Sequence, residues 1–265
     1  MIATQAPFYF DKAAHAYFRN GKPYIGTTTA LNVLSKELTW WASGQACEVL
    51  GWKNPKKFSK EECLTSAREL FTTIKGMTAE DYLKLLNKAY RAHNDRKNEA
   101  KDTGTDMHSL LEDFIRCQMA GQYPMFIDPI IEPFVKWSNA NVKRFLFTEL
   151  CTFSDVLYCA GTADFAYQDL NDNFVLGDFK SSEKPYFSHW AQVGGYDLQI
   201  SESGGYTPEG RKIFTLEKPF EYYAIFCARG GLDKPFMSRE TTRLRRAFSL
   251  CVNLYKEKMF FEEDK

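Results

Sequence analysis

The sequence predicts a mixed α/β fold with a central mixed sheet flanked by helices and a helical N-terminal subdomain. Amphipathic helical segments fill most of the chain up to about residue 144, whereas short aromatic and β-branched segments separated by turn formers follow from 145. The composition, 265 residues with 44% hydrophobic side chains, is that of an ordinary globular protein. We expect residues 1–103 to form an N-terminal hairpin and helical subdomain, and residues 104–265 to form the core, as one intertwined globular unit.

The N-terminal segment contains a clear hairpin signal. Residues 15–25 carry Asn20-Gly21 between two aromatic runs, and this pair supplies the two positive φ angles of a type I′ turn. A helix is expected from about Thr29. Two further helices begin at capping sequences, Ser59 with Glu62 and Thr78 with Asp81.

Two more helices are expected before the strands. One runs from about 105 to 119 and is bounded by glycines at 104 and 121, and the other spans about 131–142.

The strand-rich region predicts a hairpin followed by alternating elements. Strands are expected over 145–147, 151–158, 163–167 and 174–179, with a hairpin loop at 168–173. A helix over 188–200, a strand over 221–227 and a last helix from near Ser238 follow. That helix should bury the residues at helical spacing, namely Leu244, Phe248, Val252, Tyr255 and Met259.

Several protein classes are excluded by simple counts. The longest apolar run, Tyr222 to Ala228, is far shorter than the roughly 20 residues of a membrane helix. The first residues lack the pattern of a secretory signal, so we expect an intracellular protein with no membrane partner. The seven cysteines are odd in number and contain no C-x-x-C pair, which argues against a disulfide framework or a zinc ribbon.

Charge is segregated along the chain although 34 basic residues balance 34 acidic ones. Residues 145–179 contain no Lys or Arg and six acidic residues, whereas 52–103 carry twelve basic and eight acidic residues and 211–258 carry eleven and five. Basic flanks around an acidic centre suit a polyanion held beside a metal ion. On charge alone, ordinary fluctuation along the chain explains the pattern equally well.

The most informative residues are Asp164, Asp178 and Lys180. Residues two apart on a strand share a face, so Asp178 and Lys180 point the same way. If the strands pair across the 168–173 loop, Asp164 lies near Asp178. Two carboxylates beside an ammonium suit Mg²⁺ and the activation of a metal-bound water, with a downward bias on the lysine pKa. An isolated D-x-K is more typical of a salt-bridging strand end.

Residues on two helices extend this set. Gln192 and Tyr196 lie four apart on one helical face, and the intervening Gly194-Gly195 pair indicates close approach of another backbone or a ligand. Upstream, His108 lies one turn into a helix with Glu112 on the same face, although a lone helical histidine is more often structural.

Taken in order, His108, the run 161–164 (Gly-Thr-Ala-Asp), the run 178–180 (Asp-Phe-Lys) and the Gln192-x-x-x-Tyr196 pair resemble the PD-(D/E)XK nuclease superfamily. More narrowly, they are similar to its RecB-like exonuclease branch, which includes phage exonucleases and the mitochondrial genome maintenance exonuclease. The motifs cover about residues 104–200, and the hairpin with its following threonines resembles the start of phage and mitochondrial members. The resemblance implies a restriction-endonuclease-like PD-(D/E)XK core.

The resemblance also implies a role for each motif residue. His108, Asp164, Asp178 and the backbone carbonyl of Phe179 would ligate Mg²⁺ or Mn²⁺, with Glu149 as a further candidate ligand. Lys180 would position or activate the attacking water, while Gln192 and Tyr196 would lie beside the metal and contact the nucleic acid. Iron–sulfur members of the branch cluster three cysteines near the C-terminus; here Cys227 and Cys251 are isolated, so no cluster is expected.

The expected function is that of a metal-dependent DNA exonuclease acting on single strands or DNA ends in replication, recombination or repair. Two alternatives stay open: a structure-specific endonuclease of the same superfamily, and a catalytically silent nucleic-acid-binding protein. A phage origin, action in the host cytoplasm and a recombination or replication protein partner are compatible with the chain length. Candidate DNA contacts are the stacking residues Tyr186 and Trp190 and the basic residues Arg239, Arg243, Arg245 and Arg246.

Overall fold

The computed structural model describes residues 7–34 and 39–263, and for 39–41, 96–106 and 263 it describes the backbone alone. The described chain divides into two compact units. One contains residues 7–34 and 104–263 and is called the sheet unit; the other contains residues 39–103 and is called the helical unit.

The N-terminal hairpin is a part of the sheet unit. Strands β1 (Phe8–Asp11), β2 (Ala16–Arg19) and β3 (Lys22–Gly26) form an antiparallel meander. Asn20 and Gly21 have φ angles of 51° and 75°, as the type I′ turn requires. Because β3 also pairs in parallel with β5, the hairpin belongs with the core sheet, whereas the sequence-based division grouped it with the N-terminal helices.

The helices after the hairpin differ in part from expectation. The helix expected from about Thr29 is a short α1 (Thr27–Ala30) followed by the 3₁₀ turn η1 (Leu31–Leu34). The helical unit contains α2 (Thr39–Val49) and α3 (Lys60–Lys75), and α3 begins at the predicted capping box of Ser59 and Glu62.

Helix α4 (Ala79–Met119) is one continuous helix of 41 residues that begins in the helical unit and ends in the sheet unit. The sequence predicted two helices divided at Gly104, which is wrong. A glycine inside a helix is only about 1 kcal/mol less favourable than alanine. The stable helical turns before and after Gly104 can therefore keep the helix continuous.

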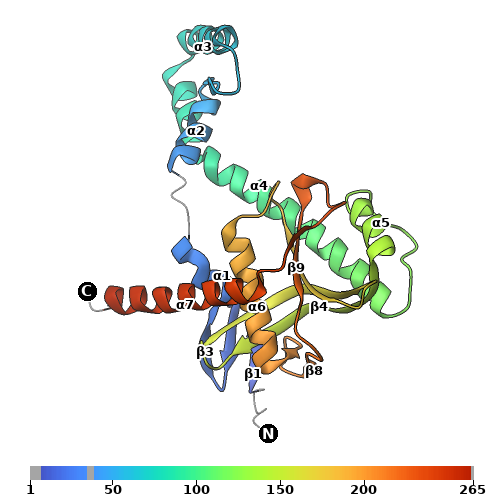
Figure 1. The fold of residues 1–265 in the computed structure, drawn as a ribbon. Coiled ribbons are helices and arrows are strands. Elements are labelled where there is room, and N and C mark those ends of the chain that lie inside the picture. Colours follow the sequence, from blue (N-terminus) through green and yellow to red (C-terminus); the bar gives the residue numbers. More distant parts are fainter. Residues whose placement is uncertain (1–6, 35–38, 264–265) are drawn as a thin grey trace. The chain divides into compact units, whose positions relative to one another are not determined.

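The sheet is mixed and curled (Figure 1). Its centre consists of β4 (Val142–Ser154), β5 (Cys159–Asp169), β6 (Phe174–Lys180) and β9 (Tyr222–Cys227). Strand β6 pairs antiparallel with β5 across the predicted 168–173 loop and parallel with β9. Strand β4 is one strand with register shifts, where two segments, 145–147 and 151–158, were expected. It ends at Ser154, and the chain turns at residues 155–158.

Short strands complete the two edges of the sheet. β7 (Gly205–Tyr206) and β8 (Lys212–Phe214) extend it beyond β4, and β10 (Phe236–Ser238) extends it beyond β9; the 3₁₀ turn η2 (Ala228–Gly230) lies between β9 and β10.

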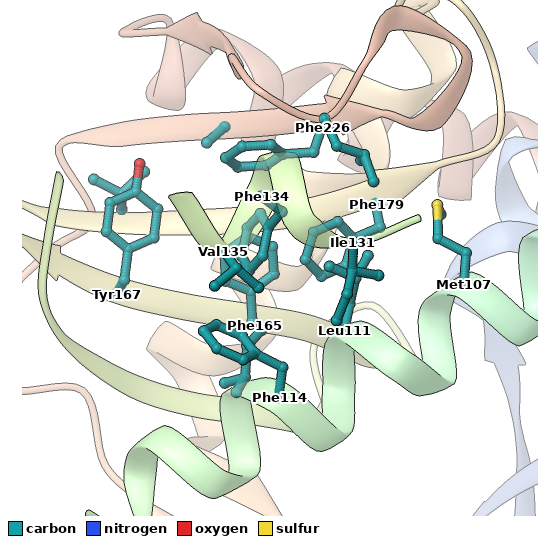
Figure 2. Packing of buried hydrophobic residues seen from close by; sticks show 14 residues of the cluster. Met107, Leu111, Phe114, Ile131, Phe134, Val135, Phe165, Tyr167, Phe179 and Phe226 are labelled. Atoms are coloured by element: carbon teal, nitrogen blue, oxygen red, sulfur yellow. The ribbon is translucent and has the colours of Figure 1, made fainter. Parts of the chain in front are cut away.

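Helices cover the two faces of the sheet. On one face, α4 and α5 (Glu132–Asn141) pack on the strands through a cluster that includes Leu111, Phe134, Phe165 and Phe179 (Figure 2). On the other face, α6 (Phe187–Ser203) packs through a second cluster that includes Val193 and Leu176. The described chain is therefore an α/β protein, as predicted.

Helix α7 (Thr241–Glu263) crosses α6 at very close range (Figure 1). A Cβ added to Gly194 would lie 2.5 Å from the backbone carbon of Leu244, and one added to Gly195 would lie 2.7 Å from the ring of Phe248. The glycine pair thus serves the predicted close backbone approach. The predicted burial holds for Leu244, Phe248 and Val252, but Tyr255 is only half-buried and Met259 is exposed.

Within residues 7–34 and 39–263, no helix combines the length and the apolar character needed to cross a membrane.

Candidate functional site

Three acidic residues lie near one another on three neighbouring strands. The pairs on either side of Glu149 in the register of β4 against β5 place it level with Asp164. The pairing of β5 with β6 ends at Phe165 and Gly177, and Asp164 and Asp178 are the residues directly beyond that last pair. Neighbouring strands are about 4.8 Å apart, so the three carboxyl groups of Glu149, Asp164 and Asp178 lie at one place on the sheet. We call them the carboxylate row.

Asp178 and Lys180 form a buried ion pair. Strand alternation places Phe179 in the α4 and α5 cluster and therefore turns Asp178 and Lys180 to the α6 face. The Asp178 side chain is 0% exposed, and its Oδ2 lies 2.5 Å from Lys180 Nζ. Neither oxygen of Asp178 accepts a well-oriented hydrogen bond from the described residues.

The electrostatics of this pair are set by burial and by Asp164. Burial raises the pKa of Asp178; Lys180 opposes this effect and Asp164 adds to it. Burial alone would lower the pKa of Lys180, but Asp178 and Asp164 outweigh burial and raise that pKa above its ordinary value. This direction holds for the metal-free site; the downward bias argued from the sequence depends on a bound cation.

Asp164 links the two strands and α4. Its Oδ2 accepts a hydrogen bond of 2.7 Å from the Phe179 backbone N–H, and His108 Nδ1 lies 3.8 Å from the same oxygen. The His108 ring also meets the Phe179 ring edge-on, with centroids 5.7 Å apart. The predicted residues His108, Asp164 and Phe179 are thus brought together.

Glu149 occupies an irregular position within β4. Its φ angle is +48°, which is uncommon for a residue other than glycine, and such conformations often occur at functional sites. Burial raises the pKa of Glu149 to about 8, and the charges of Asp164 and Glu112 contribute further. Glu112, which shares the His108 face of α4, is paired with Arg116.

Tyr196 extends the site from α6. Gln192 Nε2 donates a hydrogen bond of 2.7 Å to the Tyr196 hydroxyl, which therefore keeps its own hydrogen for another acceptor. Burial raises the pKa of this phenol, and the charges of Asp164 and Asp178 contribute further. Tyr196 thus remains a neutral donor close to both carboxylates.

The site is supported by residues whose role the sequence did not reveal. Because Gly161 has no side chain, the Tyr196 ring and Thr27 can pack against it. An added Cβ would lie 2.7 Å from Tyr196 Cε1 and 2.4 Å from Thr27 Oγ1. Thr27 donates to the Ala160 carbonyl and accepts from the buried Gln199. The threonines after the hairpin were the available signal, but only the pairing of β3 with β5 explains them.

The donors fit a hard divalent cation in chemical type. Asp164 and Asp178 offer carboxylate oxygens, the buried Oδ1 of Asp178 has no hydrogen-bond partner among the described residues, and His108 offers an imidazole nitrogen. Among the residues described, no three acidic, histidine or cysteine side chains are already arranged as a closed metal-binding group. The two aspartates with His108 are the residues that would hold Mg²⁺ or Mn²⁺, and Glu149 lies next in the row.

The predicted nucleic-acid contacts lie outside this cluster. Tyr186 is about half exposed just before α6, and Trp190 packs partly buried against the α6 cluster. Arg239 donates to the Tyr222 hydroxyl and lies over its ring, whereas Arg243 and Arg246 are exposed on α7.

Arg245 was grouped with these arginines from the sequence, and the structure corrects this interpretation. Its guanidinium forms a two-pronged ion pair with the fully buried Asp197, so it is a structural residue.

A scan against protein-family models gives no match to this chain, and a search of the curated proteins gives none. The motif residues and their geometry are therefore what indicates a function for this chain.

Proposed function

We propose that the protein is a metal-dependent deoxyribonuclease with a PD-(D/E)XK-type core, and that it acts as an exonuclease on single-stranded DNA or DNA ends. The observation that carries the proposal is the buried pair of Asp178 and Lys180 on one strand, with Asp164 of the neighbouring strand bonded to the intervening Phe179 N–H. The motif order along the chain supports the choice of the RecB-like branch. A role in replication, recombination or repair follows from that resemblance.

The reaction would be hydrolysis of a phosphodiester by water. Asp164, Asp178 and His108, with the Phe179 carbonyl, would hold Mg²⁺ or Mn²⁺, which when bound polarises the phosphate and offsets charge on the leaving oxygen. Lys180, which lies beside Asp178, would position or activate the attacking water. The Tyr196 hydroxyl, held by Gln192, donates to a phosphate oxygen.

The first test is digestion of end-labelled linear single-stranded, linear duplex and closed circular DNA with Mg²⁺, Mn²⁺ or EDTA. Wild type should degrade linear DNA only with metal and leave circles intact. Lys180→Ala should lower the rate by roughly 10²- to 10⁴-fold, the loss typical of a group that acts in the transition state. The end label also gives the polarity.

Two further variants make this test specific. Lys184→Ala removes an exposed lysine four residues away and should retain wild-type activity. Since Lys180→Ala leaves Asp178 buried without its cation, Asp164→Asn is a second inactivating change, and circular dichroism checks that both variants fold. Cleavage of circles would favour an endonuclease, and binding of DNA without any cleavage would favour a catalytically silent protein.

A further inference from the structure

An open groove lies where the start of α6, strand β10 and the start of α7 meet. Its volume is about 400 Å³, within the range of small-ligand sites. Phe187, Trp190, Met237 and Leu244 form its apolar walls, and its polar lining includes Glu240 and Arg243. We call it the α6–α7 groove.

The aromatic walls combine an exposed ring with a fixed one. The Phe187 side chain is 57% exposed and Met237 is 47% exposed, so apolar surface is available to a ligand. Trp190 is partly buried and packs against the α6 core cluster, which holds its indole in place. A fixed indole beside an accessible phenyl ring is suited to stacking on a planar base.

The charge at the groove is that expected for a nucleic-acid backbone. Arg243 and Arg246 lie three residues apart on one face of α7 and are exposed, and among the described residues neither has an ion-pair partner. Glu240 is the opposing charge in the groove lining. The two free guanidiniums outnumber that carboxylate, so the groove and its α7 flank favour an anionic ligand.

The α6–α7 groove lies close to the carboxylate row. Asp178 pairs in register with Ile225 of β9, which pairs with Phe236 of β10. β10 is therefore two strands from β6, on the order of 10 Å, and α6 begins seven residues after Lys180. One extended strand can reach both places.

We propose that the α6–α7 groove binds an unpaired nucleobase of a DNA strand, one phosphate of which lies at the carboxylate row. Arg243 and Arg246 contact the adjoining phosphates of the same strand. The inference rests on the proposed function and names its substrate more closely. Because the bases of a duplex are stacked on one another, a base can enter the groove only from a single strand or a frayed end. The substrate is therefore single-stranded DNA or the unpaired end of a duplex.

The test measures binding in EDTA, where no cleavage occurs, by fluorescence anisotropy. A labelled thymidine oligonucleotide is compared with an abasic oligonucleotide of the same length and charge. Phe187→Ala should weaken binding of the thymidine strand roughly fivefold or more, the effect of one lost stacking contact. The same substitution should leave binding of the abasic strand unchanged, because that strand has no base to stack. Arg243→Ala should weaken both strands and reduce the salt dependence.

There are two matched controls. Phe260→Ala changes another exposed phenylalanine, near the end of α7. Arg211→Ala changes an exposed arginine beside β8, at the opposite edge of the sheet. Both should bind like wild type. Equal affinity of wild type and Phe187→Ala for the thymidine strand would overturn the inference. So would an equal loss for both strands. If wild type digests DNA and either of these two results is found, this inference alone fails. If Phe187→Ala weakens binding of the thymidine strand only, but wild type digests no DNA, the proposed nuclease activity alone fails.

Discussion

At the scale of single residues, Glu149 has the most unusual combination of properties. It has a left-handed backbone conformation within a strand, and its carboxyl group feels the charge of Asp164. Its pKa of about 8, raised first by burial and then by Asp164 and Glu112, means that the folded protein holds its proton far above pH 4.5, the ordinary pKa of the group. A bound divalent cation would reverse this preference, because it favours the charged carboxylate.

Glu149 should therefore make the metal-free protein less stable as pH rises. Between pH 4.5 and about 8 the unfolded chain loses this proton while the folded chain retains it, so folding becomes progressively less favourable until the group ionises near pH 8. Relative to wild type, Glu149→Gln should gain unfolding free energy over this window, on the order of a few kcal/mol. Urea unfolding in EDTA at several pH values measures it.

The control for this comparison is Glu217→Gln, which makes the same change at an exposed site. Asp178 contributes a trend of the same sign in both proteins, so the difference between wild type and Glu149→Gln isolates Glu149. A difference that stays constant with pH would show that Glu149 is ionised throughout.

At the scale of elements, a buried network joins α6, α7 and β9. Asp197 is fully buried and accepts from Arg245 Nε at 2.6 Å and from the Tyr223 hydroxyl at 2.5 Å. Arg245 also donates to Ser201 at 2.9 Å. Asp197 directly follows Tyr196, so this network fixes the position of α6, and with it that of Tyr196, relative to the sheet.

Removal of the Asp197 carboxylate should destabilise the protein strongly. Asp197→Ala leaves a partly buried guanidinium and a buried hydroxyl without their acceptor, and we expect a loss of about 3–5 kcal/mol in unfolding free energy. Glu262→Gln breaks the exposed pair with Lys258 on the same helix α7 and should cost less than about 1 kcal/mol. Chemical denaturation measures both; similar small losses would mean that the Asp197 network is not stabilising.

At the scale of the whole molecule, the two units differ in how much they bury. The sheet unit contains large clusters of fully buried aromatic and aliphatic residues. In the helical unit, α3 buries none of its residues, and Phe71 on its apolar face is 62% exposed. Local opening costs little free energy where few contacts are lost, so α3 should open far more readily than the sheet.

Hydrogen exchange followed by mass spectrometry tests this difference. Peptides from residues 60–75 should exchange at least roughly a hundredfold faster than peptides from β5, because their local opening free energy is lower. Peptides from residues 241–252 of α7, which is helical but buries Phe248 and Val252, should be as protected as β5 and thus separate burial from helix content. Equal protection of α3 would mean that its apolar face is covered in solution.

The sequence by itself determined the features that depend on near neighbours. Asn20-Gly21 and the capping box at Ser59 act through the conformation of a few residues, so their patterns predicted the turn and the helix start. The same holds for the nearness of Asp164 and Asp178, because β5 and β6 pair across a short hairpin loop and both residues directly follow the last pair.

Only the tertiary structure decided the features that depend on distant segments. Gly104 permits either a break or a continuous helix, and nothing local to Arg245 distinguishes an exposed basic residue from the partner of a buried Asp197. The placement of Glu149 in the carboxylate row follows from a register set over the whole of β4. Such outcomes are set by the free energy of burial and long-range pairing, which is summed over residues far apart in the sequence and leaves no local signature.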